Sequence, residues 1–143
     1  MMSIDEFVKP MRDELVQAGF VELRTPEAAR ELISKNTGML LIVINSMCGC
    51  AGALARPAVL EALQQAAGRP DQLATVFAGY DREATDAVRS FIPYPPSSPS
   101  IALFRGNEVV WFLPREGIEG YSQEEVSQQI IQALNTFCQK NGE

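Results

Sequence analysis

The chain is organised around the stretch Met39-Leu40-Leu41-Ile42-Val43-Ile44-Asn45-Ser46-Met47-Cys48-Gly49-Cys50. Residues 39–44 form an unbroken apolar run rich in branched side chains, which is typical of a strand buried on both faces of an α/β sheet. Asn45 and Ser46 are of the types that cap helix N-termini, and residues 51–68, rich in Ala, Leu and Gln, predict a helix. The two thiols are therefore expected where a central strand passes into a helix.

Two cysteines at such a junction indicate thiol chemistry. Unpaired N–H groups and the positive end of a helix dipole favour a thiolate, so the pKa of a cysteine there falls below that of a free thiol. Cys48 is the predicted nucleophile, and Cys50, nearer the helix body, is the resolving or auxiliary thiol. Gly49 permits backbone torsions that larger residues resist. A Cys-Gly-Cys disulfide closes a tight ring, so we expect an oxidising couple suited to exchange with mixed disulfides.

Composition narrows the function classes. The 143 residues fit a single domain spanning 1–143, and the net charge of −6 argues against nucleic acid as a partner. The sequence shows neither an apolar run of the roughly 18 residues needed for a membrane span nor an export signal, so we expect a cytoplasmic protein without a membrane partner. Thiols are normally reduced in that compartment, which favours a catalytic or metal-binding pair over a structural one. The chain has no histidine, which excludes Cys–His catalysis.

The remaining elements follow from periodicity, caps and breakers. Pro10 predicts a kink or two shorter helices, Pro57 predicts a bend, and the four prolines within residues 93–99 exclude regular structure. Gly106-Asn107 predicts a hairpin turn. Thr25, Asp81 and Ser122 are predicted caps. We expect helices over residues 3–18, 26–35, 51–68, 82–91 and 122–140, and strands over residues 20–23, 39–44, 73–79, 100–105 and 108–113. From the central strand onward the order β-α-β-α-β-β-α, preceded by an extra helix, predicts a mixed sheet flanked by helices.

This order, with a dithiol at the first strand-to-helix turn of the core and a proline before the hairpin, resembles the thioredoxin-like fold. The resemblance extends to the bacilliredoxin family, over nearly the whole chain. It is carried by Asn45-Ser46-Met47-Cys48-Gly49-Cys50-Ala51-Gly52, Ala55-Arg56-Pro57-Ala58, Val76-Phe77-Ala78-Gly79-Tyr80-Asp81-Arg82-Glu83-Ala84-Thr85, Pro96-Ser97-Ser98-Pro99-Ser100 and Ile118-Glu119-Gly120.

The resemblance implies an enzyme that removes bacillithiol, or a related low-molecular-weight thiol, from mixed disulfides on S-thiolated client proteins. The small thiol is then a co-substrate, and no bound cofactor is expected. Histidines often occur in that family near the positions of Glu116 and Tyr121. This chain has none, so no role of those histidines is carried over.

Four further residues are candidates for the site. Pro99, after Ser98, resembles the cis-proline of thioredoxin folds, and its loop would offer backbone groups to a substrate; a trans proline that starts an edge strand is the alternative. Arg56 would add positive potential near Cys48, although a solvent-exposed arginine is an equal alternative. Cys138 lies on the apolar face of the last predicted helix, where a buried structural thiol is favoured over a redox role.

Three function classes remain open. The first is a thiol–disulfide oxidoreductase of the bacilliredoxin type. The second is a soft-metal module in which Met47, Cys48 and Cys50 hold Cu(I), or the two thiolates form part of a zinc site. A closed zinc site needs about four ligands, and the chain has three cysteines and no histidine. The third is a thioredoxin-fold interaction protein whose cysteines are incidental.

Overall fold

The computed structural model describes residues 3–47 and 51–139. Its helices are α1 (Ile4–Val16), α2 (Pro26–Lys35), α3 (Ala51–Gln65), α4 (Arg82–Arg89) and α5 (Gln123–Phe137). Its strands are β1 (Val21–Glu22), β2 (Met39–Asn45), β3 (Gln72–Phe77), β4 (Ser100–Arg105) and β5 (Glu108–Leu113), and a 3-10 turn spans Arg115–Gly117.

The described strands form a mixed sheet in the order β1-β3-β2-β4-β5. β3 runs parallel to both β1 and β2, whereas β4 is antiparallel to β2 and to β5. β4 and β5 form the predicted hairpin around Gly106-Asn107, and Gly106 has the positive φ of +62° that such a turn requires. The predicted mixed α/β sheet is therefore confirmed.

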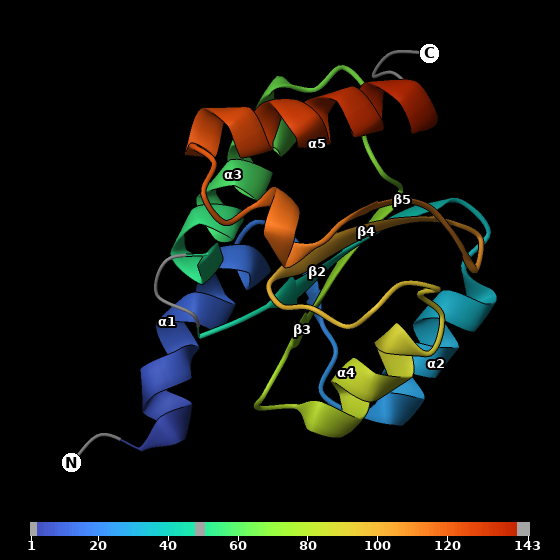
Figure 1. Cartoon of the computed structure of the whole chain (residues 1–143). Coiled ribbons are helices and arrows are strands. Elements are labelled where there is room, and N and C mark those ends of the chain that lie inside the picture. Colours follow the sequence, from blue (N-terminus) through green and yellow to red (C-terminus); the bar gives the residue numbers. More distant parts are fainter. Residues whose placement is uncertain (1–2, 48–50, 140–143) are drawn as a thin grey trace.

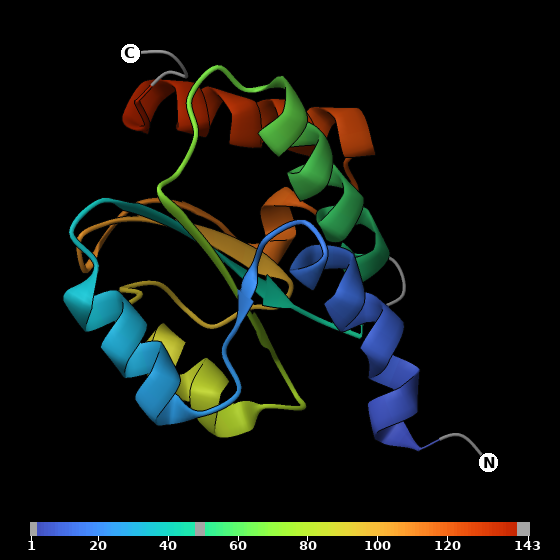
Figure 2. The ribbon, with the colours of Figure 1, turned by 180° about the vertical axis from the view of Figure 1, so that it is seen from behind.

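Helices cover both faces of the sheet. α2 and α4 lie on one face, and α3 and α5 lie on the other with α1 beside α3 (Figures 1 and 2). Side chains of the central strand alternate between the two layers: Leu41 and Val43 join the core under α3 and α5, while Leu40, Ile42 and Ile44 join the core under α2 and α4. Both faces of β2 are dry, which explains why its sequence is continuously apolar rather than alternating.

Helix starts follow the predicted capping chemistry in two of three cases. The Thr25 hydroxyl accepts a hydrogen bond from the Ala28 amide at 3.1 Å. Ser122 and Glu125 form a reciprocal capping box, with bonds of 2.9 and 3.1 Å.

Within the described residues, no helix is both long enough and apolar enough to span a membrane.

Asp81 occupies the cap position of α4, but its side chain makes no capping bond, contrary to the prediction. Its carboxylate instead accepts a 2.8 Å hydrogen bond from Nη2 of Arg12. Arg12 is 7% exposed, pairs with Glu22 and lies over the rings of Phe77 and Tyr80, 5.2 and 4.7 Å from their centroids. The carboxylate is therefore used to fasten α1 to the end of β3.

The described helices differ from the predicted ones in three places. α1 is one continuous helix with Pro10 inside it, so two shorter helices are excluded. α3 ends at Gln65 rather than at Gly68, because the amides of Ala67 and Gly68 donate to Asn135 Oδ1 at 2.9 and 3.0 Å. α4 ends two residues early, at Arg89.

β3 also ends earlier than predicted, at Phe77 rather than Gly79. Gly79 has a φ of +84°, which turns the chain away from the sheet direction toward α4. The predicted end of α5 at Lys140 lies outside the described residues, and the helix that is described ends at Phe137.

Candidate functional site

The register of the sheet brings two distant segments together. Ile44 on β2 is paired with Ser100 on β4, in antiparallel orientation. Pro99 precedes Ser100, and Asn45 follows Ile44, so the loop that enters β4 lies beside the end of β2. The next residues of the chain lead to Cys48, Gly49 and Cys50, which lie outside the described residues, so the predicted nucleophile, spacer and resolving thiol remain predictions.

The Ser98–Pro99 peptide bond is cis, as the resemblance to thioredoxin folds implies. Pro99 is buried at the start of β4, and Ser98 is partly exposed just before it. The carbonyl of Ser98 accepts a hydrogen bond from Nη1 of Arg115 at 3.4 Å. The alternative of a trans proline on an edge strand is wrong, since β4 lies between β2 and β5 in the sheet.

Ser97 anchors the same loop from three sides. Its carbonyl accepts hydrogen bonds from Arg89 Nη2 at 3.2 Å and from the Ser100 hydroxyl at 2.9 Å. Its hydroxyl accepts a bond from the Arg115 amide at 3.2 Å. These contacts tie the loop to α4 and to the turn after β5, so the backbone beside the end of β2 is held in one position.

The predicted capping role of Asn45 and Ser46 stays a prediction, because the residues directly before Ala51 lie outside the described residues. Asn45 is the last residue of β2 and is 2% exposed. Its Nδ2 donates to the Met11 carbonyl at 3.1 Å, and its Oδ1 accepts a 2.8 Å bond from the amide of Ser46. The side chain therefore links the end of the central strand to α1 and shapes the first residue of the cysteine-bearing connection.

Arg56 completes this network and is not solvent-exposed; it is only 7% exposed. Its Nη1 donates to Asn45 Oδ1 at 2.9 Å and to the Ser46 carbonyl at 3.1 Å. Its Nε donates to the Glu14 carboxylate at 3.1 Å. A buried guanidinium needs such partners to offset its lost hydration. Its positive charge contacts the carbonyl of a residue only two positions before Cys48.

Gly52 allows this close packing. A Cβ at this position would lie 2.7 Å from the Ser46 carbonyl oxygen and 3.3 Å from Arg56 Nη1. The first turn of α3 can therefore press against the end of β2 only because residue 52 has no side chain. Gly52 belongs to the motif that suggested the family, but its packing role was not predicted.

Sequence reasoning also missed Met11, Glu14, Arg89 and Arg115. Met11 contributes a backbone carbonyl, and the three charged residues reach the site from α1, α4 and the turn after β5. Charged residues near helix ends and turns are common on protein surfaces, so their types give no sign of these contacts. Only the packing of the helices on the sheet brings them to the site.

Cys138 is 7% exposed at the end of α5, as predicted for a structural thiol. Burial, reinforced by the nearby Asp71 carboxylate and opposed by Arg105, raises the pKa of its thiol from 9.0 to about 11. The thiol is therefore protonated at neutral pH and is a poor nucleophile.

Met47, the remaining candidate metal ligand of the described chain, is 37% exposed. No three Asp, Glu, His or Cys side chains among residues 3–47 and 51–139 are grouped closely enough to hold a metal ion. Cys48 and Cys50 are not among those residues, so the soft-metal alternative is not tested by this observation.

The sequence as a whole matches a family profile described as "Disulphide isomerase" over residues 4–138. A bacilliredoxin of Geobacillus kaustophilus is 51% identical over 134 residues, covering 93% of this chain and 92% of the relative. A bacilliredoxin of Shouchella clausii is also 51% identical, over 144 residues, covering 97% and 99% of the two chains. The chain belongs to the bacilliredoxin family.

Solved structures support the fold of this bacilliredoxin-family chain. Oxidised thioredoxin O2 from Arabidopsis thaliana superimposes with a TM-score of 0.54 at 15% identity, covering 82% of this chain and 96% of that one. Oxidised thioredoxin from Plasmodium falciparum gives a TM-score of 0.52 at 15% identity, covering 80% and 98%. The thioredoxin-like fold is therefore confirmed, and family and fold together are those of thiol–disulfide oxidoreductases.

Proposed function

We propose that this chain removes a low-molecular-weight thiol, bacillithiol or a related one, from mixed disulfides on client proteins. The observation that carries the proposal is the juxtaposition of the cis Ser98–Pro99 loop with the end of β2, from which the chain continues to Cys48 and Cys50. Relatives named bacilliredoxin, about half identical over nearly the full length, support the same reaction.

The reaction begins with attack by the Cys48 thiolate on the sulfur of the small thiol in the mixed disulfide. A bond forms between Cys48 and the small thiol, the original disulfide breaks, and the client leaves as a thiolate that takes a proton from water. The Cys50 thiolate then attacks the Cys48 sulfur, which expels the small thiol and leaves a Cys48–Cys50 disulfide. The dithiol has supplied two electrons, and a second thiol reductant must return them.

The described residues support this assignment in two ways. Arg56 is buried against the Ser46 carbonyl, so its positive charge lies within hydrogen-bond distance of the chain two residues before Cys48. The backbone before Pro99 is held by Arg89 and Arg115, which gives an extended substrate a fixed surface to pair with.

A trapping experiment tests the proposal. A model client carrying the mixed disulfide is incubated with the wild type, Cys48→Ser or Cys50→Ser. We expect Cys48→Ser to release no thiol and Cys50→Ser to complete one transfer, after which intact-mass and peptide mass spectrometry locate the adduct on Cys48. An adduct on Cys50 with Cys48 unmodified would reverse the roles. Absence of any release by the wild type would refute the function.

A further inference from the structure

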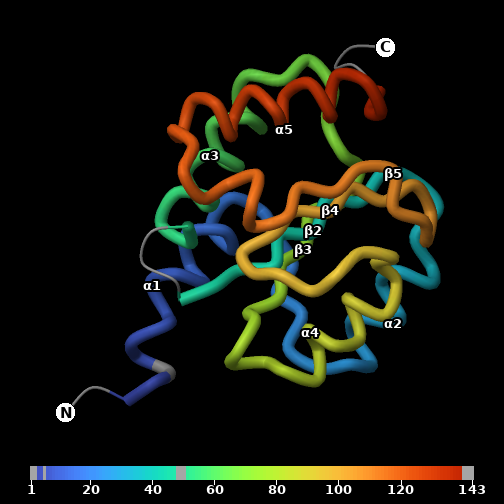
Figure 3. Tube along the Cα trace, viewed as in Figure 1, coloured from blue at the N-terminus to red at the C-terminus, as the bar shows by residue number. Residues whose placement is uncertain are grey.

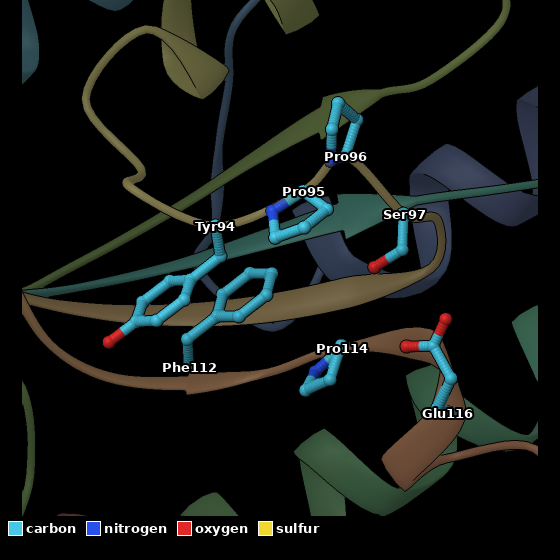
Figure 4. A pocket seen from close by; sticks show the side chains of 7 residues that line it. All are labelled: Tyr94, Pro95, Pro96, Ser97, Phe112, Pro114 and Glu116. Atoms are coloured by element: carbon cyan, nitrogen blue, oxygen red, sulfur yellow. The ribbon is translucent and has the colours of Figure 1, made fainter.

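A groove opens next to the cis-proline loop, with a volume of about 520 Å³. This is within the roughly 300–1,000 Å³ range of ligand-binding clefts. Figure 4 shows the seven residues that line it, drawn from two segments: Tyr94, Pro95, Pro96 and Ser97 on the loop before β4, and Phe112, Pro114 and Glu116 on and after β5.

The floor of the groove is apolar and rigid. The rings of Tyr94 and Phe112 stack with their centroids 5.2 Å apart and their planes 4° from parallel. Tyr94 is nevertheless 52% exposed, and Pro95 and Pro96 beside it are exposed as well. Exposed aromatic rings on a backbone stiffened by proline lose little conformational entropy on binding, and tyrosines are frequent energetic centres of interfaces.

The groove is continuous with the proposed reaction site. Figure 3 shows the segment before β4 running alongside the sheet before it turns into that strand. Ser97 lines the groove and is followed directly by the cis Ser98–Pro99 bond. Three residue steps separate Tyr94 from Ser97, which corresponds to at most about 10 Å at roughly 3.3 Å per residue. The groove is therefore long enough for about three residues of an extended peptide that pairs with the cis-proline loop.

The charge in the groove is a single negative one. Glu116 is the charged member of the seven lining residues, and it is exposed. Two arginines border the groove: Arg89 donates to the carbonyl of the lining residue Ser97 at 3.2 Å, and Arg115 pairs with Glu119 at 2.9 Å, so Glu116 is the exposed charge among the lining residues. A basic side chain near an apolar one is the combination that complements this surface.

We propose that the Tyr94–Phe112–Glu116 groove selects client polypeptides that carry an apolar and a basic residue a few positions from the thiolated cysteine. The inference rests on the proposed function and adds the class of client that the site accepts. We assign the groove to the client polypeptide rather than the small thiol, because an extended peptide that pairs with the backbone at the cis-proline would continue along the adjoining loop. Tyr94 and Phe112 supply apolar contact, and Glu116 selects the charge.

The test uses two synthetic peptides with one cysteine in a mixed disulfide with bacillithiol. In both peptides a leucine lies three positions before and three positions after the cysteine. One peptide has lysine, and the other has glutamate, four positions before and four positions after the cysteine. For the wild type we expect kcat/KM to be about 3-fold higher for the lysine peptide, the size typical of an exposed ion pair. Glu116→Lys should reverse this preference, and 0.5 M NaCl should reduce it in both proteins. Glu124→Lys, which makes the same charge change on α5, is the matched control and should keep the wild-type preference.

Tyr94→Ala tests the apolar contact that the groove is proposed to make with the client. It should lower kcat/KM for both peptides about 5-fold or more, the effect of losing an aromatic contact, while leaving the reduction of symmetric bacillithiol disulfide unchanged. An equal loss with that disulfide would assign the groove to the small thiol and overturn the proposal. A lysine-to-glutamate ratio that Glu116→Lys leaves unchanged would overturn it too.

Equilibrium binding keeps this inference separate from the proposed function. Versions of the peptides with serine in place of cysteine cannot react, and their affinities are measured by calorimetry on the same variants. Selective binding of the lysine peptide, reversed by Glu116→Lys, supports the groove even if the wild type releases no thiol. Equal binding of both peptides overturns it even if the release reaction proceeds.

Discussion

Nη1 of Arg56 donates a 2.9 Å hydrogen bond to Oδ1 of Asn45, which joins the second turn of α3 to the last residue of the central strand. Both residues are buried, at 7% and 2% exposed. Glu14 on α1 binds the same guanidinium, and the Met11 carbonyl binds the amide of the same asparagine. α1 therefore supports the cysteine-bearing connection through one polar network.

Arg56→Met should lower the free energy of unfolding by about 2–3 kcal/mol. The variant leaves Asn45 Oδ1 and the Ser46 carbonyl with one partner fewer in a buried site, which is costly. The loss stays below that of a fully buried pair because the Glu14 side chain is 37% exposed and can be hydrated. Urea denaturation measures it. Arg30→Met, at an exposed position of α2, is the control and should change stability by less than about 0.5 kcal/mol. If both substitutions changed the free energy of unfolding equally, the network would have no stabilising role.

The network should also tune the reactivity of Cys48. We expect the pH dependence of its alkylation to show a midpoint below the free-thiol value of about 8.5. Arg56→Gln removes a positive charge and should raise this midpoint. Glu14→Gln leaves the guanidinium uncompensated and should lower it. Midpoints that move in the same direction in both variants would indicate a general loosening of the site rather than an electrostatic effect.

Local patterns predict much of this fold. The apolar run ending at Ile44 identifies the central strand. Helices cover both faces of that strand, so each residue of the run is buried and apolar. The hairpin turn at Gly106-Asn107 and the capping box at Ser122 are equally local signals, since their partners lie three or fewer residues away. Pro99 was predictable only through resemblance, because a proline in sequence does not reveal its isomer.

The polar network could not be predicted in this way. Arg56 lies 11 residues from Asn45 and 42 from Glu14, and its burial depends on how α1 and α3 pack. Asp81 makes the same point: it has the residue type of a helix cap, but Arg12, 69 residues earlier, binds its carboxylate. Such tertiary partners override local preference, and a single sequence carries no record of them.

The sign of the stability change caused by Gly52→Ala distinguishes an effect of helix propensity from an effect of packing. In an exposed helix, replacing glycine by alanine stabilises by about 1 kcal/mol. Here the new Cβ would lie 2.7 Å from the Ser46 carbonyl oxygen, which belongs to the backbone and cannot move freely. Overpacking of this kind costs about 1–3 kcal/mol, so we expect net destabilisation and slower release of the small thiol.

Ala53→Gly is the matched comparison, because Ala53 is the exposed neighbour in the same helix turn. It should lose about 1 kcal/mol of stability without slowing thiol release when both proteins are assayed well below their melting temperatures. A stabilised Gly52→Ala protein with full activity would show that the contact with Ser46 yields without cost.

Cys138 should make the protein less stable at alkaline pH. Its folded pKa, raised to about 11 mainly by burial, exceeds its ordinary value of 9.0. Below pH 9 the thiol is protonated in both the folded and the unfolded states, so it contributes no pH dependence. Between pH 9 and 11 the unfolded chain loses this proton while the folded protein keeps it, so stability falls as pH rises. The slope approaches about 1.4 kcal/mol per pH unit at most.

Comparing urea denaturation of the wild type and Cys138→Ala across this range isolates the effect from other titrating groups. Parallel pH profiles, or rapid alkylation of Cys138 in the folded protein at pH 8, would contradict its assignment as a buried, inert thiol.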